Sequence, residues 1–187
     1  MSTASTAFGN SAAIEALCTT PSTPADSIAA SVAGSSWLLS SSVRLTGDCP
    51  LLSPSVSSRV VEAFVDCDYA SNTLERTFPR GLDTEVLSAD ALRTAGREAR
   101  LPSEREHVTP FVWSRPGRYR LRSVRDDVDR SDLRLTVDVA EDLQLVRAIH
   151  AELGPGWFDL DDILELLATR PELAALNAGV VQKPIDR

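Results

Sequence analysis

A short alternating run that ends in a tight acidic turn places the main limit on how this chain can fold. Residues 43–52 read Val-Arg-Leu-Thr-Gly-Asp-Cys-Pro-Leu-Leu, and the apolar and polar residues alternate at first as in a β-strand. Gly47 and Pro50 then break the pattern, so Asp48 is expected just past the carboxyl end of a strand. Ligands and metal ions bind at this end of the strands in open α/β sheets. Asp48 is therefore either a binding residue or a turn former.

A second aspartate has a similar position later in the chain. Residues 133–138 form another strand-like run, Leu-Arg-Leu-Thr-Val-Asp, and the acidic residues Glu141 and Asp142 follow it. Because acidic residues are common in the first turn of a helix, Asp138 is expected at a strand-to-helix junction. It could share one Mg²⁺ with the first aspartate, since Mg²⁺ is commonly held by one or two carboxylates plus substrate phosphates. Alternatively, Asp138 is the N-cap of the helix.

The overall composition limits the partners and the compartment. The 187 residues favour one domain, and 43% hydrophobic residues suffice for a core. The net charge of −8 argues against a nucleic-acid-binding surface. No apolar run approaches the roughly 20 residues that span a bilayer. The three cysteines are widely spaced and form no CxxC pair, which suggests neither a zinc site nor a disulfide framework. We expect a cytoplasmic protein that binds no membrane and no nucleic acid.

The chain divides into three parts by composition. Residues 1–42 are rich in Ser, Thr and Ala, with Glu15 and Asp26 as their only charged side chains, so this leader is expected to be poorly ordered. Residues 43–180 alternate between strand and helix patterns and form the expected α/β domain, and residues 181–187 are a tail.

The expected elements follow from hydrophobic periodicity and capping signals. Ser53 and Ser88 are expected N-caps, and Ser103 with Glu106 matches a capping box. Pro110 is expected to kink the helix after that box or end it early. Further strands are predicted at 68–72, 84–87 and 119–125, and helices at 54–66, 89–97, 103–113, 143–153, 160–168 and 171–176. On the 143–153 helix, the apolar face is expected to consist of Leu143, Val146, Ile149 and Leu153.

Four segments in this order resemble a known family of enzymes. They are residues 43–52, 71–86, 104–111 and 133–143, and they resemble the cytidylyltransferases of the spore coat polysaccharide biosynthesis protein F type, relatives of the acylneuraminate and ketodeoxyoctonate cytidylyltransferases. The likeness covers about residues 43–177, which corresponds to the C-terminal portion of the family. The Gly-rich loop with Arg and Lys that cradles the nucleotide in the family has no match in residues 1–42.

The resemblance implies a fold and a reaction. The fold is that of nucleotide-diphospho-sugar transferases, Rossmann-like, with a mostly parallel sheet flanked by helices, here with the N-terminal nucleotide-binding part missing. The reaction is attack of a sugar hydroxyl on the α-phosphate of CTP with release of pyrophosphate. Mg²⁺ is the expected cofactor, because it neutralises developing phosphate charge. Asp48 and Asp138 match the family's metal-binding and catalytic aspartates.

The resemblance also implies residues that contact the substrates. His107 is expected to bind the sugar or help deprotonate its hydroxyl, although a hydrogen-bonded core histidine is an alternative. Arg134 is expected to pair with Asp138 or with an anionic substrate. The segment 72–85 is either the loop that faces the acceptor sugar or a solvent loop. The expected substrate-binding residues are Arg44, Asn72, Arg76, Arg80, Gly81, Asp83, Glu85, Glu106 and Arg134.

Three functions remain open from the sequence. The first is a CTP-dependent cytidylyltransferase for surface or spore coat polysaccharide synthesis, in an incomplete form. The second is a glycosyltransferase of the same fold that uses a nucleotide-sugar. The third is a non-catalytic remnant or interaction subunit. CTP and a sugar acceptor are the expected partners, and a homodimer is an option because relatives often dimerise.

Overall fold

The computed structural model describes residues 41–182; the expected leader over residues 1–40 and most of the expected tail, residues 183–187, lie outside the described residues. The first described strand starts at Ser41, two residues before the expected boundary at residue 43. In chain order the elements are β1 (Ser41–Arg44), α2 (Pro54–Glu62), β2 (Tyr69–Ser71), β3 (Glu85–Ser88), α3 (Ala89–Glu98), α4 (Pro102–His107), α5 (Pro110–Trp113), β4 (Leu121–Ser123), α6 (Ala140–Leu153), α7 (Leu160–Thr169) and α8 (Pro171–Ala174).

The described sheet is mixed, with the strand order β1-β3-β2-β4. β3 is antiparallel to both β1 and β2, and β2 is parallel to β4. The expectation of a mostly parallel sheet is therefore wrong for residues 41–182. The reason lies in the connections: a loop without a helix joins β2 to β3 and lets the chain turn back, whereas α3, α4 and α5 separate the parallel strands β2 and β4.

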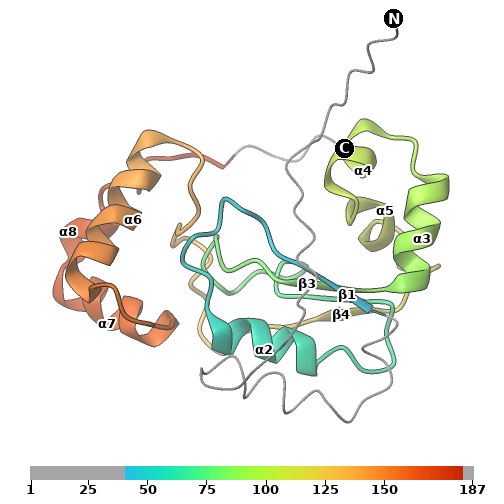
Figure 1. Cartoon of the computed structure of the whole chain (residues 1–187), viewed down its shortest axis with the longest axis horizontal. Helices are drawn as coiled ribbons and strands as arrows, with labels where there is room; N and C mark the ends of the chain where they lie inside the picture. Colours follow the sequence, from blue (N-terminus) through green and yellow to red (C-terminus); the bar gives the residue numbers. More distant parts are fainter. Residues whose placement is uncertain (1–40, 183–187) are drawn as a thin grey trace, which may run out of the picture.

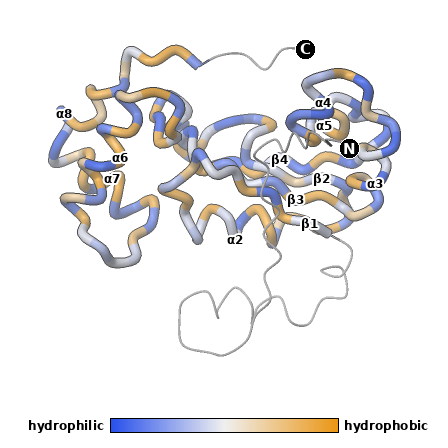
Figure 2. Tube along the Cα trace, turned by 45° about the horizontal axis from the view of Figure 1, so that its top comes forward, coloured by the Kyte–Doolittle hydropathy of each residue, from blue (hydrophilic) through white to orange (hydrophobic). Residues whose placement is uncertain are grey.

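Alternating side chains of the two central strands form two cores on opposite faces of the sheet. Ala70 and Val86 pack in the same cluster as the α2 residues Val56 and Val60. Tyr69 and its neighbours pack instead against α3 and α5. Helices thus cover both faces, as Figure 1 shows, and α2 alternates between hydrophobic and hydrophilic residues in Figure 2.

The C-terminal helices α6, α7 and α8 extend the core that contains α2. Leu145, Ile149 and Ile163 join a cluster with Phe78 and Leu135 from the loops beside the sheet. In Figure 1 these helices lie at the opposite end of the molecule from α3, α4 and α5. The sheet therefore lies between two helical groups, and its loops face both.

The buried face of α6 differs from the expected apolar face at Leu143. Leu143 is exposed, whereas Leu145 is completely buried together with Ile149. The expected face included Leu143 because its spacing to Val146 fits a helical stripe, but the helix turns this position outward.

Two helix starts confirm the expected serine caps. The hydroxyl of Ser53 accepts a 3.2 Å hydrogen bond from the amide of Val56, and Pro54 occupies the first position of α2. The hydroxyl of Ser88 accepts a 3.1 Å hydrogen bond from the amide of Ala91. Each cap satisfies one backbone N–H that the helix itself leaves without a partner.

The capping box expected at Ser103 is wrong. α4 begins at Pro102, and the carboxylate of Glu104 accepts hydrogen bonds from the amides of Arg100 (3.1 Å) and Leu101 (3.3 Å). The single helix expected over residues 103–113 is instead divided into two helices. It breaks at Val108, whose φ is 64°, and α5 restarts at Pro110.

Residues 133–138 do not form the expected strand. Their contact with the rest of the fold includes a single isolated β-bridge. Arg134 forms an isolated parallel bridge with Arg80, and the amide of Arg80 donates to the carbonyl of Leu133 at 2.9 Å. The segment therefore pairs with a loop and not with a strand, which a run of alternating residues cannot reveal. Among residues 41–182, no helix combines the length and the hydrophobicity that crossing a membrane would require.

Candidate functional site

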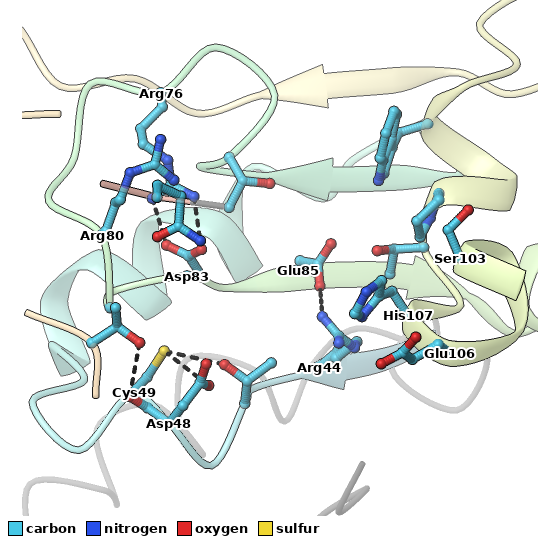
Figure 3. A pocket seen from close by; sticks show the side chains of 18 of the residues that line it. Arg44, Asp48, Cys49, Arg76, Arg80, Asp83, Glu85, Ser103, Glu106 and His107 are labelled. Atoms are coloured by element: carbon cyan, nitrogen blue, oxygen red, sulfur yellow. Dashed lines mark hydrogen bonds and ion pairs between the residues drawn. The ribbon is translucent and has the colours of Figure 1, made fainter. Parts of the chain in front are cut away.

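A cleft of about 970 Å³ is lined by residues of β1, β3, α4 and α5 and of the loops beside them. Figure 3 shows it from close by, with Asp48, Arg76, Arg80 and Asp83 toward one end and Arg44, Glu85, Glu106 and His107 toward the other. Among residues 41–182, its charged lining consists of five carboxylates, from Asp48, Asp83, Glu85, Glu106 and Asp138, and three guanidinium groups, from Arg44, Arg76 and Arg80.

The structure brings most of the expected site residues to this one cleft. Two of them, Asn72 and Arg134, are buried and do not line it. Those that do are Arg44, Asp48, Arg76, Arg80, Gly81, Asp83, Glu85, Glu106, His107 and Asp138.

Asp48 and Asp138 are held close together by the main chain. The amide of Val137 donates a 2.8 Å hydrogen bond to the carbonyl of Asp48, and the hydroxyl of Thr136 donates to the same carbonyl at 3.0 Å. Both carboxylates are solvent-exposed and line the cleft. The N-cap of α6 is Val139, so the alternative of Asp138 as the helix cap is wrong.

These two carboxylates fit the chemistry of Mg²⁺, which prefers oxygen ligands and keeps several waters. Within residues 41–182, no group of three or more His, Cys, Asp and Glu side chains is placed to hold a metal ion. Further oxygen ligands would therefore have to come from water or from substrate phosphate groups, as is usual for Mg²⁺.

Arg134 lies behind Asp138 and not in the cleft. It is almost fully buried, and its Nε and Nη2 donate to the two carboxylate oxygens of Asp142, each at 2.9 Å. It also donates to the carboxylate of Asp138 and to the side chain of Gln182. The expected pairing with Asp138 is present, whereas the guanidinium is engaged by the chain and not presented to a substrate.

The side chain of Asn72 stabilises, by hydrogen bonds, the loop that forms one wall of the cleft. Its amide nitrogen donates to the carbonyl of Leu82 at 2.7 Å, and its amide oxygen accepts from the amide of Thr84 at 2.9 Å. The side chain is completely buried. Asn72 therefore fixes the ends of the 72–84 loop, and its polar atoms point into the protein.

Gly81 lets that loop pack directly onto the extended segment at residues 134–136. Its φ is +98°, and a Cβ atom there would lie 2.4 Å from the backbone of Leu135 and of Thr136. No other residue type fits this position without movement of the backbone. The close approach places Arg80 and Asp83 beside the segment that carries Asp138.

The loop provides one paired and one unpaired arginine. Arg76 makes a bidentate ion pair with Asp83, at 2.6 and 2.7 Å. The guanidinium of Arg80 has no ion pair or hydrogen bond with any residue in the described part of the chain. Burial and the neighbouring Arg76 lower the pKa of Arg80, although the nearby Asp83 acts in the opposite direction. An anion in the cleft would compensate the positive charge of Arg80.

The centre of the cleft contains a buried polar chain. Glu85 accepts from the guanidinium of Arg44 with one oxygen and from the hydroxyl of Tyr69 with the other. Burial and the nearby charge of Glu85 raise the pKa of Tyr69 well above its usual value, so the phenol stays a donor. The side chain of Glu85, which lines the cleft, is thereby held in one orientation by partners on β1 and β2.

The sequence pattern did not predict the apolar wall of the cleft beside α4 and α5. This wall is formed by Leu74, Pro102, Pro110 and Trp113, beside the polar His107. These residues come from a loop and two short helices with no shared period, so periodicity carries no signal for them. A half-buried tryptophan beside polar groups is a surface on which a sugar ring can stack.

Cys49 lies beside Asp48 but is unsuited to be a nucleophile. Burial raises the pKa of its thiol to about 11, and the thiol lies 3.1 Å from the hydroxyl oxygen of Thr46. The thiolate is the reactive form of cysteine. Cys49 is therefore a buried packing residue of the turn.

The chain is similar to known proteins over most of its described length. No family model matches it. Protein MJ1063 of Methanocaldococcus jannaschii is 30% identical over 145 residues, which cover 75% of this chain and 58% of that protein. The spore coat polysaccharide biosynthesis protein SpsF of Bacillus subtilis is 29% identical over 138 residues, with 71% and 56% covered. The chain thus spans a little over half the length of these curated relatives.

A solved structure shares the fold. A cytidylyltransferase from Leptospira borgpetersenii superposes with a TM-score of 0.69 at 28% sequence identity, over 78% of this chain and 61% of that one. The chain is therefore related to the cytidylyltransferases.

Proposed function

We propose that this chain contributes the metal and acceptor part of a CTP-dependent sugar nucleotidyltransferase. The observation that carries the proposal is the placement of Asp48 and Asp138 on one cleft by the hydrogen bond between Val137 and the Asp48 carbonyl. The relatedness to a cytidylyltransferase and to a polysaccharide biosynthesis protein supports CTP as the nucleotide and polysaccharide synthesis as the setting.

The aspartate end of the cleft would bind the phosphate groups. Asp48 and Asp138 would hold Mg²⁺, which supplies charge neutralisation on the phosphate oxygens and aligns the leaving pyrophosphate. Arg80 would bind a phosphate oxygen or another anionic group directly, because no described residue neutralises its guanidinium. Arg76 would maintain the shape of this wall through its ion pair with Asp83.

The opposite end would bind the acceptor sugar. Glu85 and Arg44 offer an acceptor and donors in fixed positions, and Glu106 and His107 line the same region. Sugar hydroxyls need such paired donors and acceptors, and Trp113 offers a ring face. His107 is the residue that we assign to accept the proton of the attacking hydroxyl, because an imidazole nitrogen can act as a general base and the side chain lines this part of the cleft.

The test is a calorimetric titration of the full chain with CTP, with and without Mg²⁺. Saturable binding that needs Mg²⁺ supports the proposal, and a candidate acceptor sugar should then release pyrophosphate. GTP and ATP serve as matched controls for the base. A folded chain that binds none of these nucleotides with Mg²⁺ contradicts the proposal.

A second candidate is a binding subunit that supplies the acceptor cleft to a nucleotide site completed elsewhere. The observation that favours it is that, among the arginines of residues 41–182 that line the cleft, Arg44 and Arg76 are already ion-paired and Arg80 alone is left for a triphosphate. In that case the chain would bind the acceptor sugar but not CTP. Binding of a nucleotide-sugar in preference to CTP would indicate instead a glycosyltransferase of the same fold.

A further inference from the structure

Arg134 connects a cleft residue to a buried network that the proposed chemistry does not use. The side chain of Arg134 is 7% exposed, whereas that of Asp138 is 45% exposed at the edge of the cleft. Arg134 donates to Oδ2 of Asp138, and the other carboxylate oxygen of Asp138 makes no hydrogen bond within residues 41–182. Arg134 thus binds one carboxylate oxygen of Asp138, and the other oxygen can still bind a ligand in the cleft.

Asp142 fixes the orientation of Arg134. It is completely buried and accepts from both the Nε and the Nη2 of Arg134, so the plane of the guanidinium is set by a two-point contact. Asp142 also accepts from the backbone amides of Asp138 at 3.0 Å and Val139 at 3.2 Å. The same carboxylate therefore positions both the main chain and, through Arg134, the side chain of Asp138.

The C-terminal end of the described chain completes the network. The amide nitrogen of Asn177 donates to Asp142 at 2.8 Å and to the carbonyl of Arg134 at 3.0 Å. The side chain of Gln182, which also lines the cleft, accepts from Arg134. Arg134 is thus held by residues from before α6, from α6 itself and from the segment after α8.

We infer that Arg134 is a positioning residue that holds Asp138 in one orientation toward the cleft, with Asp142 as its buried counter-ion. The inference rests on the proposed function in assigning a metal-binding role to Asp138. It differs from the expectation that Arg134 binds the substrate, because all contacts of its guanidinium in the described structure are with the chain.

The physical argument is that a carboxylate on a surface rotates among several orientations unless a second group holds it. Hydrogen bonds behind a metal ligand orient it, and their loss typically lowers metal affinity by about 10–100-fold. A bare guanidinium beside Asp138 would repel a cation, but the carboxylate of Asp142 compensates that charge. Lysine cannot replace this arginine, since a single ammonium lacks the planar fork that reaches both carboxylates.

The experiment compares Arg134→Lys with the parent and with Arg170→Lys. Arg170 is a matched control, because it also bridges two carboxylates, those of Glu152 and Glu172, but lies on the exposed surface of the C-terminal helices. The first readout is the χ1 population of Asp138, obtained by NMR from its Hα–Hβ couplings without any metal. The second readout is the affinity for Mn²⁺ alone, measured by the loss of its free electron paramagnetic resonance signal.

We expect one dominant χ1 orientation of Asp138 in the parent and in Arg170→Lys, and averaging in Arg134→Lys. Mn²⁺ affinity should fall by about tenfold in Arg134→Lys only. Asp142→Asn should act in the same direction, and where it fails to fold, Arg134→Lys decides alone. An Asp138 side chain that keeps one orientation in Arg134→Lys overturns the inference.

The two readouts separate this inference from the proposed function. A parent chain that holds Asp138 in one orientation through Arg134 but binds no Mn²⁺ supports the positioning role and contradicts the metal site. A parent that binds Mn²⁺ with an affinity that Arg134→Lys leaves unchanged overturns the positioning role and supports the metal site.

Discussion

The main-chain amide of Val137 donates a 2.8 Å hydrogen bond to the main-chain carbonyl of Asp48. The two residues are far apart in the sequence, and this contact lies where the turn after β1 meets the extended segment before α6. Because the bond is between backbone atoms, it does not depend on which side chains face the cleft. Substitutions of the flanking aspartates can therefore change binding without moving the segments that carry them.

The first prediction concerns those aspartates. Asp48→Asn and Asp138→Asn should each weaken Mg²⁺-dependent CTP binding by at least about tenfold, because an amide is a much poorer ligand for Mg²⁺ than a carboxylate. The melting temperature of Asp48→Asn should stay close to that of the parent, since its side chain is exposed and makes no ion pair within residues 41–182. Asp90→Asn, a change on the exposed surface of α3, serves as the control. Parent-like binding in both variants would contradict a shared metal site.

The second prediction concerns the packing of Gly81. Gly81→Ala should lower the free energy of unfolding by about 3 kcal/mol, because the new Cβ atom would clash with backbone and the positive φ disfavours alanine. Urea unfolding followed by circular dichroism measures the change. Gly47→Ala is the matched control, since nothing lies within 4 Å of its added Cβ atom. Equal stabilities of the two variants would show that the loop can move away from residues 135–136.

The third prediction concerns Arg80 as the anion-binding group of the cleft. Arg80→Gln should weaken CTP binding by about tenfold, the effect of losing one charge-assisted hydrogen bond. Arg122→Gln changes an exposed arginine on β4 and should leave the affinity unchanged. Calorimetry at two salt concentrations should also show a weaker salt dependence for Arg80→Gln only. The same affinity in both variants would exclude direct contact between Arg80 and the nucleotide.

The fourth prediction concerns the thiol of Cys49. Because burial raises its pKa to about 11, the thiolate fraction at about pH 8 is on the order of a hundredfold lower than for an ordinary cysteine. Iodoacetamide should therefore modify Cys49 slowly in the folded chain and rapidly in urea, as followed by mass spectrometry of its peptide. The test uses a Cys18→Ser variant, because Cys18 lies outside the described residues. Fast modification in the folded chain would contradict the buried position.

The fifth prediction concerns Asp159, which joins the starts of α2 and α7. Its carboxylate accepts from the hydroxyl of Ser53, from the amide of Ser55 at 3.2 Å and from the amide of Leu160 at 2.8 Å. Burial alone would raise its pKa, but these hydrogen bonds lower it below the usual value.

A depressed pKa in the folded state gives stability that is fully present above the unfolded pKa of about 3.9 and is lost as the pH falls through the lower folded value. Asp159→Asn should therefore remove part of the acid sensitivity below about pH 4 and lower the stability at neutral pH. Asp161→Asn, in the exposed first turn of α7, should do neither. Unfolding by urea at several pH values distinguishes the two variants, and matching pH profiles would contradict the role of Asp159.

Local signals in the sequence predicted local features well. The caps Ser53 and Ser88 and the proline at the start of α2 follow from backbone groups within the same few residues, so short-range chemistry determines them. The presence of most expected side chains on one cleft followed from the family resemblance. The strands expected at 68–72, 84–87 and 119–125 lie close to β2, β3 and β4, whereas the one expected at 133–138 did not form.

Long-range pairing was not predictable in the same way. The direction of β3 depends on how the 72–84 loop closes, and that depends on contacts of Asn72 that no periodic pattern encodes. The segment at 133–138 has the composition of a strand but pairs with a loop, because Gly81 lets the loop approach it. The sequence indicated Asp138 as a partner of Arg134, but it did not indicate that Arg134 is buried. Asp142 and Asn177 contact Arg134 only once the C-terminal helices have packed.

The charges around the cleft affect the order in which ligands can enter it. Two of its three guanidinium groups are already neutralised by Asp83 and Glu85, so Arg80 faces the remaining carboxylates of Asp48, Glu106 and Asp138. A free nucleoside triphosphate approaching this surface would be repelled more than attracted. We therefore expect the cation to enter before the nucleotide or as its complex, so that cation concentration sets the rate of nucleotide uptake as well as its affinity.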